Sequence, residues 1–192
     1  EISSKEWWRQ CVSLSFHLAG VSLDDYKKEQ IFQRIYSRFG SHAAYEAFPD
    51  AVPFLKWANR RGIVCGVLSN ADERYGDSIL PMLGFTHDEL SFRCFSKEFN
   101  LEKPDARFYM AAINEAKPWT SHTACKPCEV LHVGNDFRRD FDGARRAGMH
   151  AVLLDRYNEP ELANEWKRRG APVFKDLLDV VEFLGRSNCI LG

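Results

Sequence analysis

Apolar side chains recur at helical spacing over the first part of the chain. Ser3 and Glu6 have the spacing of a capping box, so a helix is expected over residues 3–19. Asp24 is a suitable cap for a second helix, which is expected to end at Gly40. The aromatic residues of this helical pair are most simply explained as packing in a core or an interface, with an aromatic ligand cage as the alternative.

From residue 50 onward, short apolar runs alternate with helical patterns. Near-continuous apolar runs are typical of strands buried on both faces of a parallel sheet. Strands are expected at Ile63–Leu68, Phe92–Phe95, Val130–Val133 and His150–Leu154, with an extended stub at 172–174. Helices are expected at 50–61, 72–83, 105–116, 137–147, 161–169 and 175–184. The alternation predicts an α/β fold with an open parallel sheet and helices on both faces.

The composition limits the possible classes of protein. The chain has 192 residues, 45% hydrophobic and 28% charged, which suits one domain, or one domain with a small appendage. The net charge of −1 gives no reason to expect a nucleic-acid partner, and no apolar stretch is long enough to expect a membrane span. The chain begins with Glu1 and not with Met, so a longer natural N-terminus is expected.

The six cysteines are irregularly spaced, so reduced thiols and an intracellular location, in the cytoplasm or the mitochondrion, are expected. Cys125 and Cys128 form a single CxxC motif, and His122 and His132 lie near it in the sequence. A zinc knuckle is the alternative to two unrelated thiols, which we favour because a second CxxC is absent. Residues 189–192 have the outline of a prenylation box, which we interpret as chance because glycine is a poor last residue.

Polar side chains follow three of the expected strands, at the point where each strand ends. Ser69 and Asn70 close the first strand, Lys103 follows the second, and Asp136 and Asp140 follow the third. The carboxyl ends of parallel strands meet at one crevice, so these groups are expected to converge. Ser69 and Asn70, with the neighbouring amides, are expected to bind phosphate oxygens. The lysine suits phosphate charge, and the carboxylates suit Mg²⁺. Together they outline a site for phosphoryl transfer.

Each of these pieces also has a purely structural interpretation. The serine and asparagine could form a turn and cap a helix, and the lysine could lie in a loop that leads to a helix cap. The two aspartates could simply favour the start of a helix, balanced by Arg138 and Arg139 on a solvated face. The three pieces in this order, each directly after a buried strand, favour the functional interpretation.

The ordered motifs resemble those of the haloacid dehalogenase superfamily of hydrolases over nearly the whole chain. They are Val67–Asn70, Glu102–Asp105, His132–Asp136 with Asp140, and Asp142–Met149. The resemblance implies that Ser69 contacts phosphate, that Lys103 stabilises the nucleophile and the phosphate, and that Asp136 and Asp140 are metal-side acids. A subgroup resemblance over Trp7–Val21 implies that residues 1–48 are part of a helical cap. Residues 49–192 are then the α/β core without its first strand.

Two departures from the family pattern limit what the resemblance implies. The first motif, Asp-x-Asp-x-Thr/Val at the end of the first strand, is absent, and with it the nucleophile and the acid/base. The only Asp-x-Asp is Asp140–Asp142, which belongs to the fourth motif. Asn135 stands directly after Gly134, where the family often has Asp. The chain alone is therefore not expected to hydrolyse anything by the phosphoaspartyl route.

The missing first motif also removes a strand that the resemblance places in the middle of the sheet. Unpaired strand edges are unfavourable, so three explanations remain. The chain is a fragment of a longer protein, another chain or segment fills the position, or the protein is a degenerate scaffold subunit. We expect a Mg²⁺-dependent phosphatase of a small phosphorylated metabolite if the missing segment exists. The alternative is an inactive binding or scaffold component of a larger complex, and a dehalogenase fits less well.

Overall fold

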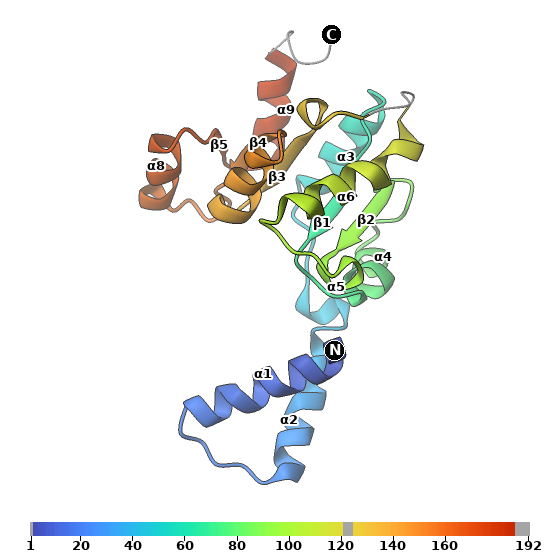
Figure 1. Ribbon diagram of the computed structural model, residues 1–192. Coiled ribbons are helices and arrows are strands. Elements are labelled where there is room, and N and C mark those ends of the chain that lie inside the picture. The colour runs from blue at the N-terminus through green and yellow to red at the C-terminus, as the bar shows by residue number, and fades with distance from the viewer. Residues whose placement is uncertain (1, 121–124, 187–192) are drawn as a thin grey trace. The chain divides into compact units, whose positions relative to one another are not determined.

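The computed structural model describes residues 2–120 and 125–186. Residue contacts divide the chain into two units, whose elements are labelled in Figure 1. The first unit combines Glu1–Ala47 with Asp72–Phe85, and the second combines Phe48–Ala71 with Thr86–Gly192. The expected boundary near residue 48 agrees with the end of the first segment, but Asp72–Phe85 was expected to belong to the α/β core. That residues 1–48 are a partial cap stays a prediction.

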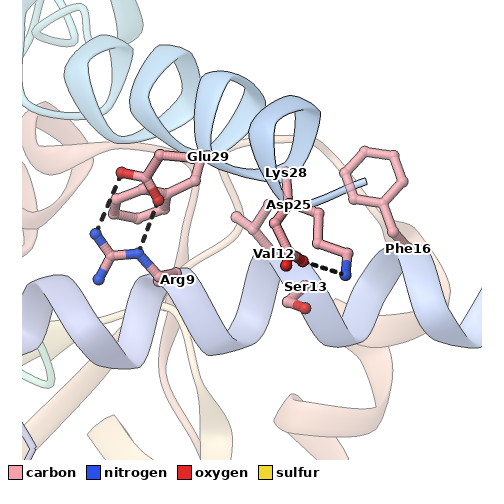
Figure 2. Close-up of a pocket in the computed structure, with 8 residues that line it drawn as sticks. Arg9, Val12, Ser13, Phe16, Asp25, Lys28 and Glu29 are labelled. Carbon is pink, nitrogen blue, oxygen red and sulfur yellow. Dashed lines mark hydrogen bonds and ion pairs between the residues drawn. The ribbon is translucent and has the colours of Figure 1, made fainter. Parts of the chain in front are cut away.

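The first unit is helical. Its elements are α1 (Ser4–Leu18), α2 (Asp25–Arg38), the 3-10 turn η1 (His42–Ala44), the π-helix η2 (Tyr75–Ile79) and α4 (Leu80–Met82). The predicted caps of the first two helices are confirmed, because the side chain of Ser3 accepts from the Glu6 amide and that of Asp24 accepts from the Lys27 amide. Figure 2 shows residues of α1 and α2 that line a pocket.

Polar contacts tie the later segment of the first unit to α1. The Ser4 hydroxyl donates to Glu73 at 3.0 Å, and the Trp8 indole donates to Asp72 at 3.3 Å. Arg74 pairs with the same Asp72 carboxylate at 2.8 Å. Residues that the sequence pattern assigned to a helix of the core therefore pack with the N-terminal helices.

The second unit contains all the strands, in two parallel ladders. One ladder pairs β1 (Gly66–Ser69) with β2 (Phe92–Phe95). The other has the order β3 (Leu131–Gly134), β4 (His150–Leu154) and β5 (Val173–Phe174). Within the described ranges no ladder joins β1 to β3, so each of these two strands has an edge without a strand partner.

Four helices of the second unit lie within a few residues of their predicted positions: α3 (Ala51–Asn59), α6 (Ala106–Ala116), α8 (Pro160–Arg168) and α9 (Leu177–Arg186). The short helix α5 (Ser96–Phe99) was not predicted, and α7 (Gly143–Arg146) forms only the end of the helix expected at 137–147. Shorter helical turns are η3 (Lys117–Trp119), η4 (Pro127–Glu129) and the π-helix η5 (Phe137–Asp142). None of the described helices is long and apolar enough to cross a membrane.

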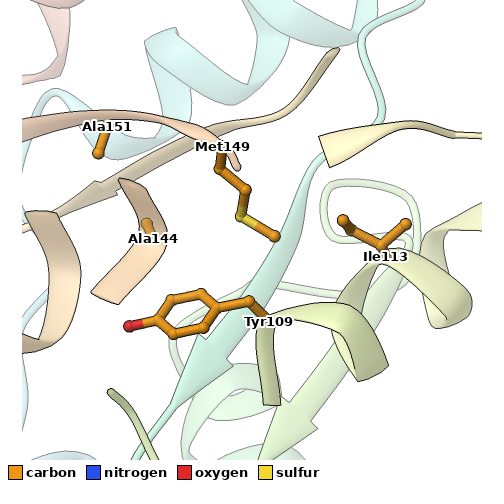
Figure 3. Close-up of a cluster of buried hydrophobic side chains, with 5 residues drawn as sticks. All are labelled: Tyr109, Ile113, Ala144, Met149 and Ala151. Atoms are coloured by element: carbon orange, nitrogen blue, oxygen red, sulfur yellow. The ribbon is translucent and has the colours of Figure 1, made fainter. Parts of the chain in front are cut away.

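The side chains of β4 show that helices cover both faces of its sheet. Ala151 packs in the cluster drawn in Figure 3, with residues of α6 and α7, and Leu153 packs against Trp166 of α8. Val152 and Leu154 point the other way and pack against Val180 of α9. The alternation follows from the two-residue period of a strand. The predicted α/β fold with a parallel sheet and helices on both faces is confirmed.

Burial is distributed unusually across the strands. Cys94 and Phe95 of β2 are buried, as are four of the five residues of β4. All four residues of β3 are only half-buried, and β1 begins with the exposed Gly66. Central strands of a parallel sheet are normally its most buried ones. The low burial of β1 and β3 therefore coincides with their unpaired edges.

Candidate functional site

Asn70 joins the end of β1 to the loop that carries Lys103. Its side-chain amide donates to the Lys103 carbonyl at 2.9 Å, and its carbonyl oxygen accepts from the Lys103 amide at 2.7 Å. Two reciprocal bonds fix both the position and the orientation of the lysine backbone. Asn70 was predicted to bind phosphate, and the structure shows in addition that its side chain is engaged with the protein.

The Lys103 ammonium lies against Asp140 from the turn that follows β3. The Nζ atom is 2.7 Å from Asp140 Oδ1, and the two side chains are 11% and 6% exposed. The two residues come from loops that are 37 positions apart in the chain. The structure therefore brings together two of the predicted site residues at the carboxyl ends of β1 and β3.

The Asp140 carboxylate accepts four hydrogen bonds. Its Oδ1 contacts the Lys103 ammonium and His132 Nε2 at 2.7 and 3.1 Å, and its Oδ2 accepts from the amides of Asn135 and Asp136, both at 2.9 Å. Burial alone would raise the pKa of Asp140, but the hydrogen bond to His132 and the charge of Lys103 hold that pKa well below its usual range. Asp140 is therefore ionised at neutral pH.

A π-helix places Asp140 in this position. The side chain of Asp136 caps η5 by accepting from the Arg139 amide at 2.7 Å, and the Asp136 carbonyl accepts from the Asp140 amide at 2.7 Å. A Cβ atom on Gly134 would overlap the Asp140 side chain, so only glycine lets the carboxylate approach the strand end. Single π-turns of this kind frequently occur at functional sites.

Ser69 is the last residue of β1 and is half-buried. Its hydroxyl forms no hydrogen bond to any residue that the structure describes, although its neighbour Asn70 forms two. A hydroxyl at a strand end with no protein partner is available to a ligand. The predicted phosphate-contacting role of Ser69 stays a prediction that this geometry allows.

His132 was missed as a member of the site by sequence reasoning. It lies on β3 inside one of the family-like motifs, but it was considered only as a ligand of the alternative zinc knuckle. The structure places its ring beside Asp140, with Tyr109 edge-on at a centroid distance of 5.7 Å. The signal available in the sequence was its position two residues before Gly134, on the same strand face as that glycine.

The protein groups at this edge supply only part of a magnesium site. Both oxygens of Asp140 are occupied by hydrogen bonds, and a cation there would lie close to the Lys103 ammonium. Asp136 has one oxygen that forms no hydrogen bond in the described residues, and the Asn135 side chain is exposed beside it. Among the described residues no group of three or more His, Cys, Asp or Glu side chains could hold a metal ion. A further oxygen ligand is needed, so the metal roles of Asp136 and Asp140 stay predictions.

The alternative zinc knuckle gains no support from the described residues. Cys125 is half-buried and Cys128 is exposed, and both are free thiols. His122 lies outside the described residues, as do the last four positions with their prenylation-like outline.

The order of motifs and the geometry agree with a family comparison. The family model described as haloacid dehalogenase-like hydrolase matches residues 1–148. The chain belongs to the haloacid dehalogenase-like hydrolases. Phosphatases of this family generally use Mg²⁺.

Curated relatives share this family. Haloacid dehalogenase-like hydrolase domain-containing protein 3 of Bos taurus is 31% identical over 80% of this chain and 57% of its own length. The protein of the same name from Homo sapiens is 30% identical over 100% of this chain and 71% of its own length. A phosphoserine phosphatase from Thermus thermophilus is 32% identical over 64% of this chain and 46% of its own length. The chain thus spans less than two thirds of the bovine relative.

Solved structures show the same fold. A haloacid dehalogenase-type phosphatase from Thermococcus onnurineus has a TM-score of 0.65 at 19% identity, over 90% of this chain and 70% of its own. An L-2-haloacid dehalogenase from Xanthobacter autotrophicus has a TM-score of 0.67 at 19% identity, over 93% of this chain and 75% of its own. Because both reactions occur on this fold, the fold alone does not select between them.

Proposed function

We propose that this haloacid dehalogenase-like chain forms part of a Mg²⁺-dependent phosphatase that acts on a small phosphorylated metabolite. Activity requires a further strand that carries a nucleophilic carboxylate. The observation that carries the proposal is the Lys103–Asp140 ion pair. It is tied through Asn70 to the end of β1, where the Ser69 hydroxyl forms no hydrogen bond to the described residues.

The proposed phosphate contacts come from β1 and from the lysine loop. The Ser69 hydroxyl and the backbone amides that follow it bind phosphate oxygens. An ammonium group has three N–H donors, and Asp140 is the only acceptor of Lys103 among the described side chains. The remaining donors are available for phosphate, while Asp140 orients the ammonium.

The proposed cation site uses Asp136 as its protein carboxylate, assisted by the amide oxygen of Asn135 and completed by the carboxylate of the further strand. Asp140 acts mainly through Lys103 in this arrangement, because its oxygens are already hydrogen-bonded. When bound, Mg²⁺ supplies positive charge against the phosphate oxygens.

The proposed position of the further strand lies between β1 and β3. Both strands have an unpaired edge and low burial, and their known partners run parallel to them. A parallel strand there would satisfy both edges and join the two ladders into one sheet. It comes either from a longer form of this chain or from a protein partner, in an intracellular compartment.

The rival is a catalytically inactive subunit that uses the fold as a binding or scaffold surface. The observation that favours it is chemical: the described residues contain no strand that ends in Asp-x-Asp, and Asp140 is fully engaged. A dehalogenase has less support, because nothing at the site selects a haloacid.

Intact mass and N-terminal sequencing of the native protein, followed by a phosphatase panel with and without Mg²⁺, separate these proposals. The phosphatase proposal expects an Asp-x-Asp-x-Thr or Val segment after an apolar run, and phosphate release that requires Mg²⁺. The 192-residue chain alone is expected to be inactive on the same panel. If neither the native chain nor any tightly bound partner contains this Asp-x-Asp segment, the result would favour the inactive scaffold subunit.

A further inference from the structure

Tyr109 lies on α6, directly against the turn that carries Asp140. Its side chain is fully buried, and its hydroxyl donates a hydrogen bond to the backbone carbonyl of Arg139. Figure 3 shows the ring below Met149, with its hydroxyl on the side of Ala144. No motif marked this tyrosine, and nothing in the proposed mechanism uses it.

The hydroxyl contacts η5 where the pattern of helical hydrogen bonds changes. In an α-helix the Gly143 amide would donate to the Arg139 carbonyl, four residues earlier. Here the Gly143 amide donates to the Arg138 carbonyl instead, at the spacing of a π-helix. The tyrosine hydroxyl therefore binds a carbonyl that the π-turn has released from its usual partner.

The hydroxyl is a permanent donor in this environment. Burial, followed by the charge of Asp140, raises the pKa of Tyr109 well above its usual range. The phenol is therefore protonated at neutral pH. It can satisfy the carbonyl of Arg139, which the π-turn leaves without the Gly143 amide.

Space for this contact is provided by Gly143. A Cβ atom at that position would overlap the Tyr109 hydroxyl and would lie 2.9 Å from Pro104 Cβ. Pro104 follows Lys103 directly in the chain. The hydroxyl thus occupies a tight space between the lysine loop and the aspartate turn.

The ring of Tyr109 reaches Asp140 by a second route. It lies edge-on to the His132 imidazole, with centroids 5.7 Å apart and an interplanar angle of 85°. His132 Nε2 in turn contacts Asp140 Oδ1 at 3.1 Å. One side chain therefore supports both the backbone before Asp140 and a ring that contacts its carboxylate.

We propose that Tyr109 is a positioning residue that holds the π-turn in the conformation that directs Asp140 at Lys103. The functional part of this inference rests on the proposed phosphatase, but its structural part does not. Loss of the hydroxyl loosens the turn, and with it the two amides of Asn135 and Asp136 that donate to Asp140.

The test is amide hydrogen exchange, measured by NMR on the 192-residue chain with Tyr109→Phe. We expect the Asn135 and Asp136 amides to exchange about tenfold faster relative to the Val152 amide of β4, as expected for loss of one partly buried hydrogen bond. Tyr157→Phe, at an exposed tyrosine, is the matched control and should leave the ratio unchanged. An equal acceleration of all three amides, or none, would overturn the proposal.

Gly143→Ala provides a second variant that keeps the tyrosine but displaces its hydroxyl. It should accelerate the same two amides, and failure to do so would also count against the proposal. In a catalytically active form of the protein, Tyr109→Phe should lower kcat with little change in KM. Because the exchange measurement needs no catalysis, failure of the phosphatase proposal and failure of this one are distinguishable.

Discussion

The Lys103 ammonium and the Asp140 carboxylate form an ion pair of 2.7 Å between two loops, and both side chains are almost fully buried. Removal of charged groups from water is unfavourable, so such a pair needs further hydrogen bonds to be stable. Asp140 receives them from two backbone amides and His132. Groups of the protein itself therefore hold the pair in place.

Replacement of Lys103 by Met should destabilise the fold, because the buried Asp140 carboxylate loses its opposite charge. We expect a loss of about 3 kcal/mol in the free energy of unfolding at neutral pH. Urea denaturation measures this loss, with Lys167→Met on the exposed side of α8 as the control. Adding Asp140→Asn to Lys103→Met should restore part of the stability, since the uncompensated charge is removed. Equal stability of Lys103→Met and the wild type would contradict a buried pair.

Asn70→Ala should also destabilise the protein, by about 2 kcal/mol, because the Lys103 amide and carbonyl both lose a partner. Asn59→Ala is a suitable comparison, since the Asn59 side chain donates one exposed bond to the Asp88 carbonyl. We expect the Asn70 variant to lose clearly more stability in the same denaturation experiment. Indistinguishable losses would show that the reciprocal bonds do not hold the lysine loop.

Asp50 should make the stability depend on pH. Its carboxylate contacts the Arg156 guanidinium at 3.0 Å and accepts from the Leu177 amide at 2.7 Å. Burial alone would raise the pKa of Asp50, but these partners lower it. A lowered pKa in the folded state means that the contribution is present above about pH 4, the ordinary value for Asp, and is lost as the pH falls towards the folded pKa.

The difference in unfolding free energy between wild type and Asp50→Asn should therefore be largest near neutral pH and shrink below about pH 4. Urea titrations over that range measure it. A difference that grows on acidification would have the wrong sign for this ion pair.

The steric relation between Gly143 and Tyr109 predicts a coupled pair of substitutions. Gly143→Ala should destabilise the wild type, because the new Cβ overlaps the tyrosine hydroxyl. In the Tyr109→Phe background the same substitution should destabilise less, since the overlapping atom is absent. A double-mutant cycle on free energies of unfolding should give a coupling of about 1 kcal/mol. Additive effects would mean that the two side chains do not meet.

The sequence predicted the fold well where local patterns decide it. Apolar runs identified the strands β1 to β4, and Ser3 and Asp24 marked helix starts, because strand burial and capping depend on nearby residues. The sequence could not show that Asp72–Phe85 packs with the N-terminal helices, since that depends on contacts such as Trp8 with Asp72, 64 positions apart.

The candidate site was likewise only partly predictable from the sequence. The positions of Lys103 and Asp140 after their strands followed from the parallel sheet, but their direct contact did not. The engagement of both Asp140 oxygens depends on the π-turn and on the absence of a side chain at Gly134. Periodicity predicts an α-helix there and gives no warning of a π-helix, whose extra residue changes which amides reach the carboxylate.

The most direct test of the central claim is phosphate release from a broad panel of small phosphorylated metabolites by the native protein, with and without Mg²⁺, for wild type and Lys103→Met. We predict release that requires Mg²⁺ and that falls at least about a hundredfold in the variant, because Lys103 is proposed to contact the phosphate. A native protein that contains the first-motif aspartates but releases no phosphate in the presence of Mg²⁺ would contradict it. So would a Lys103→Met variant that is as active as the wild type.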